Sequence, residues 1–377
     1  MKILAGYADW QHNDQRKKLN EYGGIGYYRT VKPMQMLDHD VRVVGKEITH
    51  YGNDLESQWD TIFKEFDLFV TSYFADPRAG AAIIYHARKH GKKFVLDIDD
   101  NYLDVPLSNM AYDEFKPGKK NRAFLSTILS FADAITVSTE PLKERIQGHI
   151  KEIHKLDKPV FVIPNMNDVK DWDFPIAKPK KGRFTIGYSG SNSHQDDLQM
   201  VMPAIAKVMK KHKHVHFELV GAIAKDKVKE YFGRAGFDDD CLMRIHLLAA
   251  TATFKEFPQY LLERGWDIGI APLVDTAFTR SKSHIKWMEY SMAKIPTVAS
   301  RVYPYFMDID GRDTIRHRET GYLCKPHEWF DTLDSVVTNY DKSIGDNAYE
   351  YIKKEWQYDP TKIRQVYAEI FNLPPQI

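Results

Sequence analysis

Short apolar segments alternate with longer amphipathic ones along the whole chain. Apolar runs in the first half predict strands at Lys2–Gly6, Val41–Val44, Leu68–Thr71, Phe94–Leu96, Ala134–Val137 and Val160–Ile163. Equivalent runs in the second half predict strands at Phe184–Gly190, Phe217–Gly221, Arg244–Leu248, Trp266–Leu273 and Thr297–Ala299. Helical segments such as Arg78–His90 and Leu198–His212 separate them. This alternation is typical of an α/β fold with doubly wound parallel sheets, in which ligands bind beyond the carboxyl ends of the strands.

A polar, proline-containing stretch interrupts this rhythm near the middle of the chain. It includes Pro175, Pro179 and the run Lys178–Gly182, a composition typical of an interdomain linker. A chain of 377 residues is long enough for two domains with full cores. We therefore predict an N-terminal domain at 1–172, a linker at 173–183 and a second domain at 184–356.

The composition is that of a globular protein without a dominant charge. Hydrophobic residues make up 43% of the sequence and aromatic residues 13%, and the formal net charge is +1. Such a charge gives no global attraction to nucleic acid or to an anionic membrane. Cys241 and Cys324 lie far apart in the sequence and indicate a reducing compartment. No apolar run has the length of a signal-peptide core or a membrane span, so we expect a cytoplasmic protein.

One stretch of the second half carries the densest candidate chemistry. A helix from about Ser281 to Ala293 is predicted by the three- and four-residue spacing of Ile285, Met288, Met292 and Ile295. Arg280, Lys282 and Ser283 would then lie at the N-terminal end of this helix, where free N–H groups and the helix dipole favour a phosphate. Glu289, about two turns further along, can accept hydrogen bonds from sugar hydroxyls.

Glu289 with the following Ile295–Ser300 resembles the donor-binding motif of retaining glycosyltransferases of the GT-B type, most closely the GT4 group. That motif has a second glutamate eight residues earlier, where this chain has Ser281, and we hypothesise that Lys282 and Ser283 replace it. The resemblance implies two Rossmann-like domains facing a central cleft, with a C-terminal helix at about 357–377 that crosses back to the first domain. It also implies a UDP- or GDP-sugar donor held mainly by the second domain, and a retaining reaction that requires no metal or other cofactor.

The start of the second domain resembles the opening of a GT-B nucleotide-binding domain. The small residues Ser189, Gly190 and Ser191 would let a diphosphate approach the backbone. His194 stands near the place where the family usually carries arginine and lysine, so other cations must meet the phosphate charge. In the resembled family the nucleotide base lies near the end of the third strand of this domain, which makes Leu247 a donor-binding candidate.

Two loops of the first domain are candidates for the acceptor side of the cleft. The candidates are Gly23, Gly24 and Gly26 before a predicted helix, and Lys119, Lys120 and Arg122 in a polar, basic loop. Glycines let a backbone approach a phosphate or a sugar closely, although this spacing is not the dinucleotide fingerprint. Variable loops on a rigid scaffold carry specificity. Both loops also have ordinary structural interpretations, a glycine-dependent turn and a solvated charged surface.

The segment Asp97–Asp100 follows a buried strand of the first domain. Paired carboxylates in that place suit a divalent metal, as in GT-A transferases, and also resemble the nucleophile strand of haloacid-dehalogenase-type phosphatases. Such carboxylates also cap turns or pair with neighbouring basic residues. We predict that Asp99 or Asp100 faces the cleft and positions or deprotonates the acceptor hydroxyl, while Arg280 and Lys282 stabilise the leaving diphosphate.

Together these features predict a glycosyltransferase that moves a sugar from a nucleotide sugar to an acceptor hydroxyl. The acceptor classes left open are a glycan, a lipid, a protein and a hydroxymethylated base of phage DNA, for which lysine-rich patches would be suitable. Three other functions also stay open. They are a metal-dependent Asp-x-Asp enzyme, either GT-A-like or a phosphatase, a sugar-nucleotide epimerase, and a non-catalytic glycan-binding protein.

Overall fold

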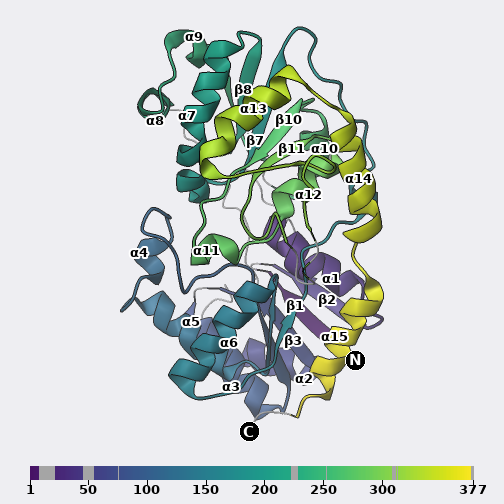
Figure 1. Ribbon diagram of the computed structural model, residues 1–377. Coiled ribbons are helices and arrows are strands. Elements are labelled where there is room, and N and C mark those ends of the chain that lie inside the picture. The colour runs from purple at the N-terminus through teal and green to yellow at the C-terminus, as the bar shows by residue number, and fades with distance from the viewer. Residues whose placement is uncertain are drawn as a thin grey trace.

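The computed structural model describes residues 1–7, 22–45, 55–74, 76–221, 228–251, 253–307, 311 and 313–374. Within these residues the strands form two six-stranded sheets, and neighbouring strands pair in parallel. The first half of the chain, purple to blue-green in Figure 1, lies below the green second half, and helices flank both sheets. No helix in the described ranges combines the length and the apolar character needed to cross a membrane.

The order of the strands explains where a ligand site can form. The first sheet has the order β2 (Asp40–Val44), β1 (Lys2–Gly6), β3 (Leu68–Ser72), β4 (Lys93–Ile98), β5 (Ala134–Val137) and β6 (Val160–Val162). The second has the order β12 (Tyr322–Cys324), β11 (Thr297–Ser300), β10 (Ile268–Ala271), β7 (Phe184–Ser189), β8 (Val215–Val220) and β9 (Ile245–Leu248). The connections after β7 and β10 run to opposite sides, so a crevice opens at the carboxyl ends of these neighbouring strands.

The helices alternate with the strands as the sequence pattern predicts. Those of the first half are α1 (Lys32–Gln35), α2 (Leu55–Glu65), α3 (Pro77–Lys89), α4 (Tyr112–Phe115), α5 (Lys120–Phe131) and α6 (Glu140–His154). Those of the second half are α7 (Gln195–Lys211), α8 (Val228–Arg234), α9 (Asp239–Leu242), α10 (Phe257–Leu262), α11 (Ala277–Arg280), α12 (Ile285–Met292), α13 (Trp329–Thr338), α14 (Ser343–Glu355) and α15 (Pro360–Asn372). Shorter segments are a π-helical turn at Gly26–Val31 and 3₁₀ turns at Val169–Trp172, Asn192–His194 and Pro326–Glu328.

Several helix ends have a clear local cause. The side chains of Asp76, Thr139 and Asp359 accept hydrogen bonds from the first free N–H groups of α3, α6 and α15. The predicted strands agree with the observed ones to within two residues at each end, because fully buried apolar runs are a strong signal for parallel strands. Residues 174–183 contain neither a helix nor a strand, and the chain passes from the first sheet to the second there.

The C-terminal helix α15 returns to the first half of the chain and lies beside the first sheet (Figure 1). Before it begins, the hydroxyl of Tyr358 donates a 2.9 Å hydrogen bond to the backbone carbonyl of Tyr28. Within it, Arg364 donates to the carbonyl of Met36 at 2.9 Å. The fold-class prediction is therefore confirmed, including the C-terminal helix that crosses back.

A buried ion pair organises the centre of the first half. Arg29, in the π-helical turn, donates from Nε and Nη2 to both carboxylate oxygens of Asp97 at the end of β4, at 3.0 and 2.7 Å. Thr136 of β5 donates to the same carboxylate at 2.6 Å, and Arg29 also donates to the Asn165 side chain at 3.0 Å. The side chains of Arg29 and Asp97 are 1% and 3% exposed, so each charge depends on the other.

Replacing Asp97 with alanine is expected to lower the free energy of unfolding by about 3–5 kcal/mol, because it leaves a buried guanidinium without its counterion. Urea denaturation followed by circular dichroism measures the loss. The control is Asp113→Ala, which removes an exposed pair with Lys116 and is expected to change stability far less. Equal, small losses in both variants would contradict this role for the buried pair.

Candidate active site

A cavity of about 790 Å³ lies between the carboxyl ends of the two sheets. Its walls include Gly23, Gly24, Tyr28, Asp99, Asp100 and Asn165 from the first half of the chain. They include Ser189, Gly190, Ser191, His194, Lys282, Ser283, Lys286 and Glu289 from the second half. Most of the residues proposed from the sequence as site residues thus line one space, which is large enough for a ligand of nucleotide size.

The ends of β7 and β8 form the part of the cavity wall that belongs to the second half of the chain. A side-chain carbon at Gly190 would lie 2.6 Å from the hydroxyl oxygen of Tyr188, so only glycine fits there without displacing that ring. The backbone N–H of Ser189 donates to the Tyr290 hydroxyl at 2.9 Å. Gly221 has a positive φ of 76° and lines the same cavity. A ligand can therefore approach the main chain closely at this point.

Helix α12 presents a carboxyl group and an ammonium group to the cavity. Glu289 is buried, and the Tyr28 hydroxyl donates to its Oε1 at 3.2 Å. Burial raises the pKa of the Glu289 carboxyl, an effect that the nearby Lys286 ammonium opposes. Lys286 lies three residues earlier, on the same face of the helix. Burial lowers the pKa of its ammonium group.

Lys286 has neither a hydrogen bond nor an ion pair to any residue in the described ranges. Its Nζ lies 5.5 Å from the centre of the Tyr188 ring. A partly buried cation without an ion pair is costly, so this side chain indicates an anionic ligand. The sequence analysis missed Lys286, although its three-residue spacing from Glu289 would have placed both on one helical face.

The loop that leads into α12 connects the two halves across the cavity. Lys282 forms an ion pair with Asp100, with 2.9 Å between Nζ and Oδ2. The side-chain amide of Asn165 donates to the Ser283 hydroxyl at 2.8 Å. The Thr139 hydroxyl donates to the backbone carbonyl of residue 281 at 2.8 Å. These contacts hold the phosphate-binding candidates against the carboxylates of the first half.

The expected helix from Ser281 to Ala293 is wrong at its start, and this changes the position of Arg280. A separate helix, α11, ends at Arg280, and α12 begins only at Ile285. A capping box at Thr276 starts α11 independently, which explains the break. Arg280 points away from the cavity walls: its guanidinium is 59% exposed and lies 2.6 Å from the Asp275 carboxylate. Arg280 is therefore not placed at the N-terminus of α12.

The three acidic side chains at the end of β4 and just after it have three different environments. Asp97 is buried against Arg29, whereas Asp99 and Asp100 line the cavity. Burial, followed by the charges of Asp100 and Asp97, raises the pKa of Asp99 to about 6, against a 3.1 Å hydrogen bond from Tyr102. Asp100 is occupied by its pair with Lys282. Asp99 is thus the carboxyl group of this segment best suited to exchange a proton near neutral pH.

His194 lies at the entrance of α7 and lines the cavity. Its Nδ1 is 2.8 Å from Oδ2 of Asp197, whose other oxygen accepts from the backbone N–H of Val274 at 2.7 Å. Burial, followed by the charges of Lys286 and Lys282, lowers the pKa of His194, while burial raises the pKa of Asp197 to about 6. A neutral imidazole can contact a ligand here but cannot neutralise a phosphate.

The remaining candidates lie outside the cavity walls. They are Leu247, inside β9 and packed against the core, Gly26, buried in the π-helical turn, the exposed Lys119 and Lys120, and Arg122. Arg122 donates to the backbone carbonyls of Leu103 and Phe115, at 2.5 and 3.4 Å, so it holds its own loop together. Beyond the end of β9, the cavity is lined by Ala250 and Thr251 instead of Leu247. The loop of Lys119 and Lys120 begins α5, away from the cleft lining.

Among the described residues, two groups have the spacing of metal ligands. They are Asp60 with His86 and His90, and Asp238 with Asp240 and Cys241. Neither group lies in the cavity or includes an acidic residue of the segment after β4.

No protein-family model and no curated protein matches the chain. Several solved structures, by contrast, are similar to the chain. HepE of Anabaena, in complex with UDP and glucose, has a TM-score of 0.60 at 15% identity, covering 98% of this chain and 99% of that one. A glycosyltransferase of Rickettsia africae has a TM-score of 0.62 at 15% identity, with 98% of each chain covered. The protein has the GT-B fold.

Other solved GT-B structures are also similar. The UDP-forming α,α-trehalose-phosphate synthase of Burkholderia xenovorans has a TM-score of 0.59 at 10% identity, with 99% of each chain covered. TarM has a TM-score of 0.57 at 16% identity, covering 85% of this chain, which spans only 59% of TarM. These likenesses concern the GT-B fold, and the narrower GT4 resemblance stays a prediction.

Replacing Lys286 with methionine is expected to stabilise the ligand-free protein, because it removes a partly buried cation that forms no ion pair within the described chain. We expect a gain on the order of 1 kcal/mol, or about 2–4 °C in the thermal midpoint. Differential scanning fluorimetry measures the midpoint. The matched control is Lys282→Met, which leaves Asp100 without its partner and is not expected to stabilise. A lower thermal midpoint for Lys286→Met would contradict the interpretation that Lys286 is a destabilising cation without an ion pair.

Proposed function

We propose that this protein is a glycosyltransferase that moves a sugar from a nucleotide-sugar donor to an acceptor hydroxyl. The observation that carries the proposal is Lys286, a partly buried cation that forms no ion pair within the described chain, at the crevice of the second sheet of a GT-B fold. HepE binds UDP and glucose, and the trehalose-phosphate synthase is UDP-forming, which supports a UDP-sugar as donor.

The donor would lie against the second half of the chain. Its diphosphate would approach the backbone at Gly190 and receive the ammonium groups of Lys286 and Lys282. Charge builds up on the diphosphate as the sugar leaves, and fixed cations in a water-poor cavity stabilise that charge most strongly. Glu289 would accept hydrogen bonds from the sugar hydroxyls. The donor-binding wall would be completed by Ser189, Ser191, His194 and Ser283.

The acceptor would enter from the first half, toward Asp99. This carboxyl group faces the cavity, and in its ionised form it can accept the proton of an attacking hydroxyl. Gly23 and Gly24 lie on the same side, where a side-chain carbon at Gly24 would meet no atom within 4 Å. Retention at the anomeric carbon and independence from metal belong to the proposal through the family resemblance. A glycan, a lipid and a modified DNA base stay the acceptor classes.

The metal-dependent Asp-x-Asp alternative fits this arrangement less well. Two carboxylates must be available together to hold a divalent ion. Here Asp97 is neutralised by Arg29 and Asp100 by Lys282, so only Asp99 is left without a basic partner at its oxygens.

Transfer is expected to weaken in acid, with kcat/KM falling about tenfold per pH unit below a midpoint near pH 6, because Asp99 must be ionised to accept a proton. Asp99→Asn is expected to lower kcat by about 10²–10⁴-fold and to remove this acid limb. Initial rates between pH 4.5 and 8 measure both effects. An unchanged acid limb in Asp99→Asn would exclude Asp99 as the base.

Nucleotide binding tests the proposal itself. We expect UDP or GDP to raise the thermal midpoint without magnesium, and the effect to persist in EDTA. A nucleotide concentration of about 100 times Kd stabilises the folded protein by about 2.7 kcal/mol. Lys286→Met should lose most of this shift, whereas the control Lys151→Met, an exposed site on α6, should keep it. If no nucleotide diphosphate shifts the midpoint, or if magnesium is required, the proposed donor site is wrong.

A further inference from the structure

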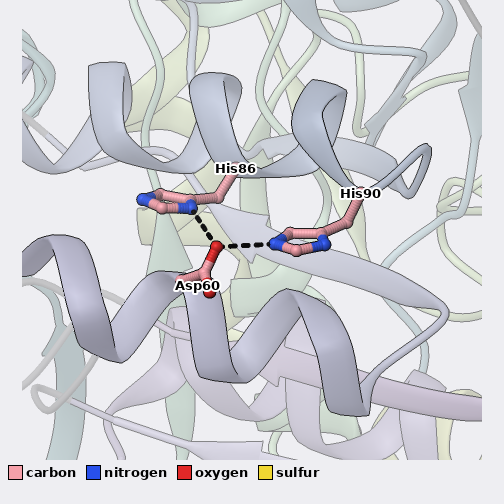
Figure 2. Close-up of side chains that lie close together, drawn as sticks. All are labelled: Asp60, His86 and His90. Atoms are coloured by element: carbon pink, nitrogen blue, oxygen red, sulfur yellow. Dashed lines mark hydrogen bonds and ion pairs between the residues drawn. The ribbon is translucent and has the colours of Figure 1, made fainter.

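A second cluster of polar side chains lies on the outer helices of the first half, away from the cleft. Asp60 comes from α2, His86 comes from α3, and His90 is the residue that directly follows α3; the four-residue spacing of the two histidines places both imidazoles on one side of this helix. Figure 2 shows both rings directed at the same carboxylate. His90 Nε2 is 2.8 Å and His86 Nδ1 is 3.4 Å from the same oxygen, Oδ1 of Asp60.

These separations are close to those of a tetrahedral metal site. Zinc binds imidazole nitrogen and carboxylate oxygen at about 2.0–2.2 Å, so two ligand atoms on one tetrahedral ion lie roughly 3.3 Å apart. One ligand atom from each of Asp60, His86 and His90 falls within 4.8 Å of the other two. Small rotations of these side chains would therefore place an ion between all three.

The state of His86 is an independent reason to look for a ligand. Its side chain is 1% exposed, and neither ring nitrogen has a hydrogen-bond partner among the described residues. Buried polar groups are rarely left unpaired, and each exception requires an explanation. A metal ion would supply the missing partner at Nδ1.

Two lysines compete for the carboxylate. Lys89 Nζ is 2.6 Å from Oδ1 of Asp60, and Lys64 Nζ is 2.5 Å from Oδ2. Both side chains are largely solvent-exposed, at 47% and 64%, so they can move away at little cost. An ion at Oδ1 must displace Lys89, while Lys64 can keep its contact with the other oxygen. Lys64 and Lys89 should thus weaken the binding of a metal ion without preventing it.

We propose that Asp60, His86 and His90 bind one divalent transition-metal ion, with water as the fourth ligand. Two imidazoles and one carboxylate suit zinc, copper or nickel better than magnesium or calcium, which prefer oxygen ligands. The ion would join α2 to α3 and stabilise the first half of the chain. It would take no part in sugar transfer, so this proposal stands or falls independently of the proposed function.

The test is zinc titration of the EDTA-treated, dialysed full-length protein by isothermal calorimetry, with cobalt(II) absorption as a probe of tetrahedral geometry. We expect one zinc per chain and a higher thermal midpoint with zinc. His90→Ala and Asp60→Asn should each weaken binding by at least about 10–100-fold, the loss typical for removing even an outer partner of a metal ligand. Circular dichroism of the metal-free variants checks that they are folded.

Two further variants make the result specific. Lys89→Met should tighten zinc binding, because it removes the ammonium that competes for Oδ1. His216→Ala is the control: it alters another close imidazole pair, with 3.1 Å between His216 Nδ1 and His246 Nε2, and should leave the titration unchanged. Absence of zinc binding, or equal affinity in the wild type, His90→Ala and Asp60→Asn, would overturn the proposal and leave a hydrogen-bonded ion cluster only.

Discussion

The ion pair between Lys282 and Asp100 joins the carboxyl end of one parallel sheet to that of the other. Hydrogen bonds from Asn165 to Ser283 and from Thr139 to the neighbouring backbone reinforce it. In each sheet, parallel packing leaves the loops after the strands free to carry polar side chains. The pair brings these two sets of loops face to face across the cavity.

The distribution of charge across the cavity gives each wall a different chemical role. Of the three aspartates Asp97, Asp99 and Asp100, Arg29 neutralises the first and Lys282 the third, which leaves Asp99 with a pKa near 6. On the opposite wall, Lys286 is influenced by the charge of Glu289 but forms no ion pair in the described chain. The wall with Lys286 is therefore suited to bind an anion, and the wall with Asp99 is suited to accept a proton. This asymmetry is what transfer of a sugar from a diphosphate to a hydroxyl requires.

The sequence was sufficient for the fold because both sheets are built from short runs of buried apolar residues, a pattern that depends little on distant contacts. It was less informative about individual side chains. Arg280 was expected at the start of α12, but a local capping box starts a separate short helix, α11, which ends at Arg280 and leaves that side chain largely exposed. Arg122 was expected to face an acceptor, yet it binds carbonyls of its own loop. Lys286 was missed, since its importance comes from the absence of an ion pair in three dimensions.

The most direct measurement is a crystal structure of the protein with UDP, or with whichever nucleoside diphosphate stabilises it most. The account predicts the diphosphate at the carboxyl ends of β7 and β10, with a phosphate oxygen within hydrogen-bond distance of Lys286 Nζ and close to the backbone of Gly190. A diphosphate bound at the exposed Arg280, or elsewhere outside the cavity, with Lys286 still lacking a partner, would contradict it.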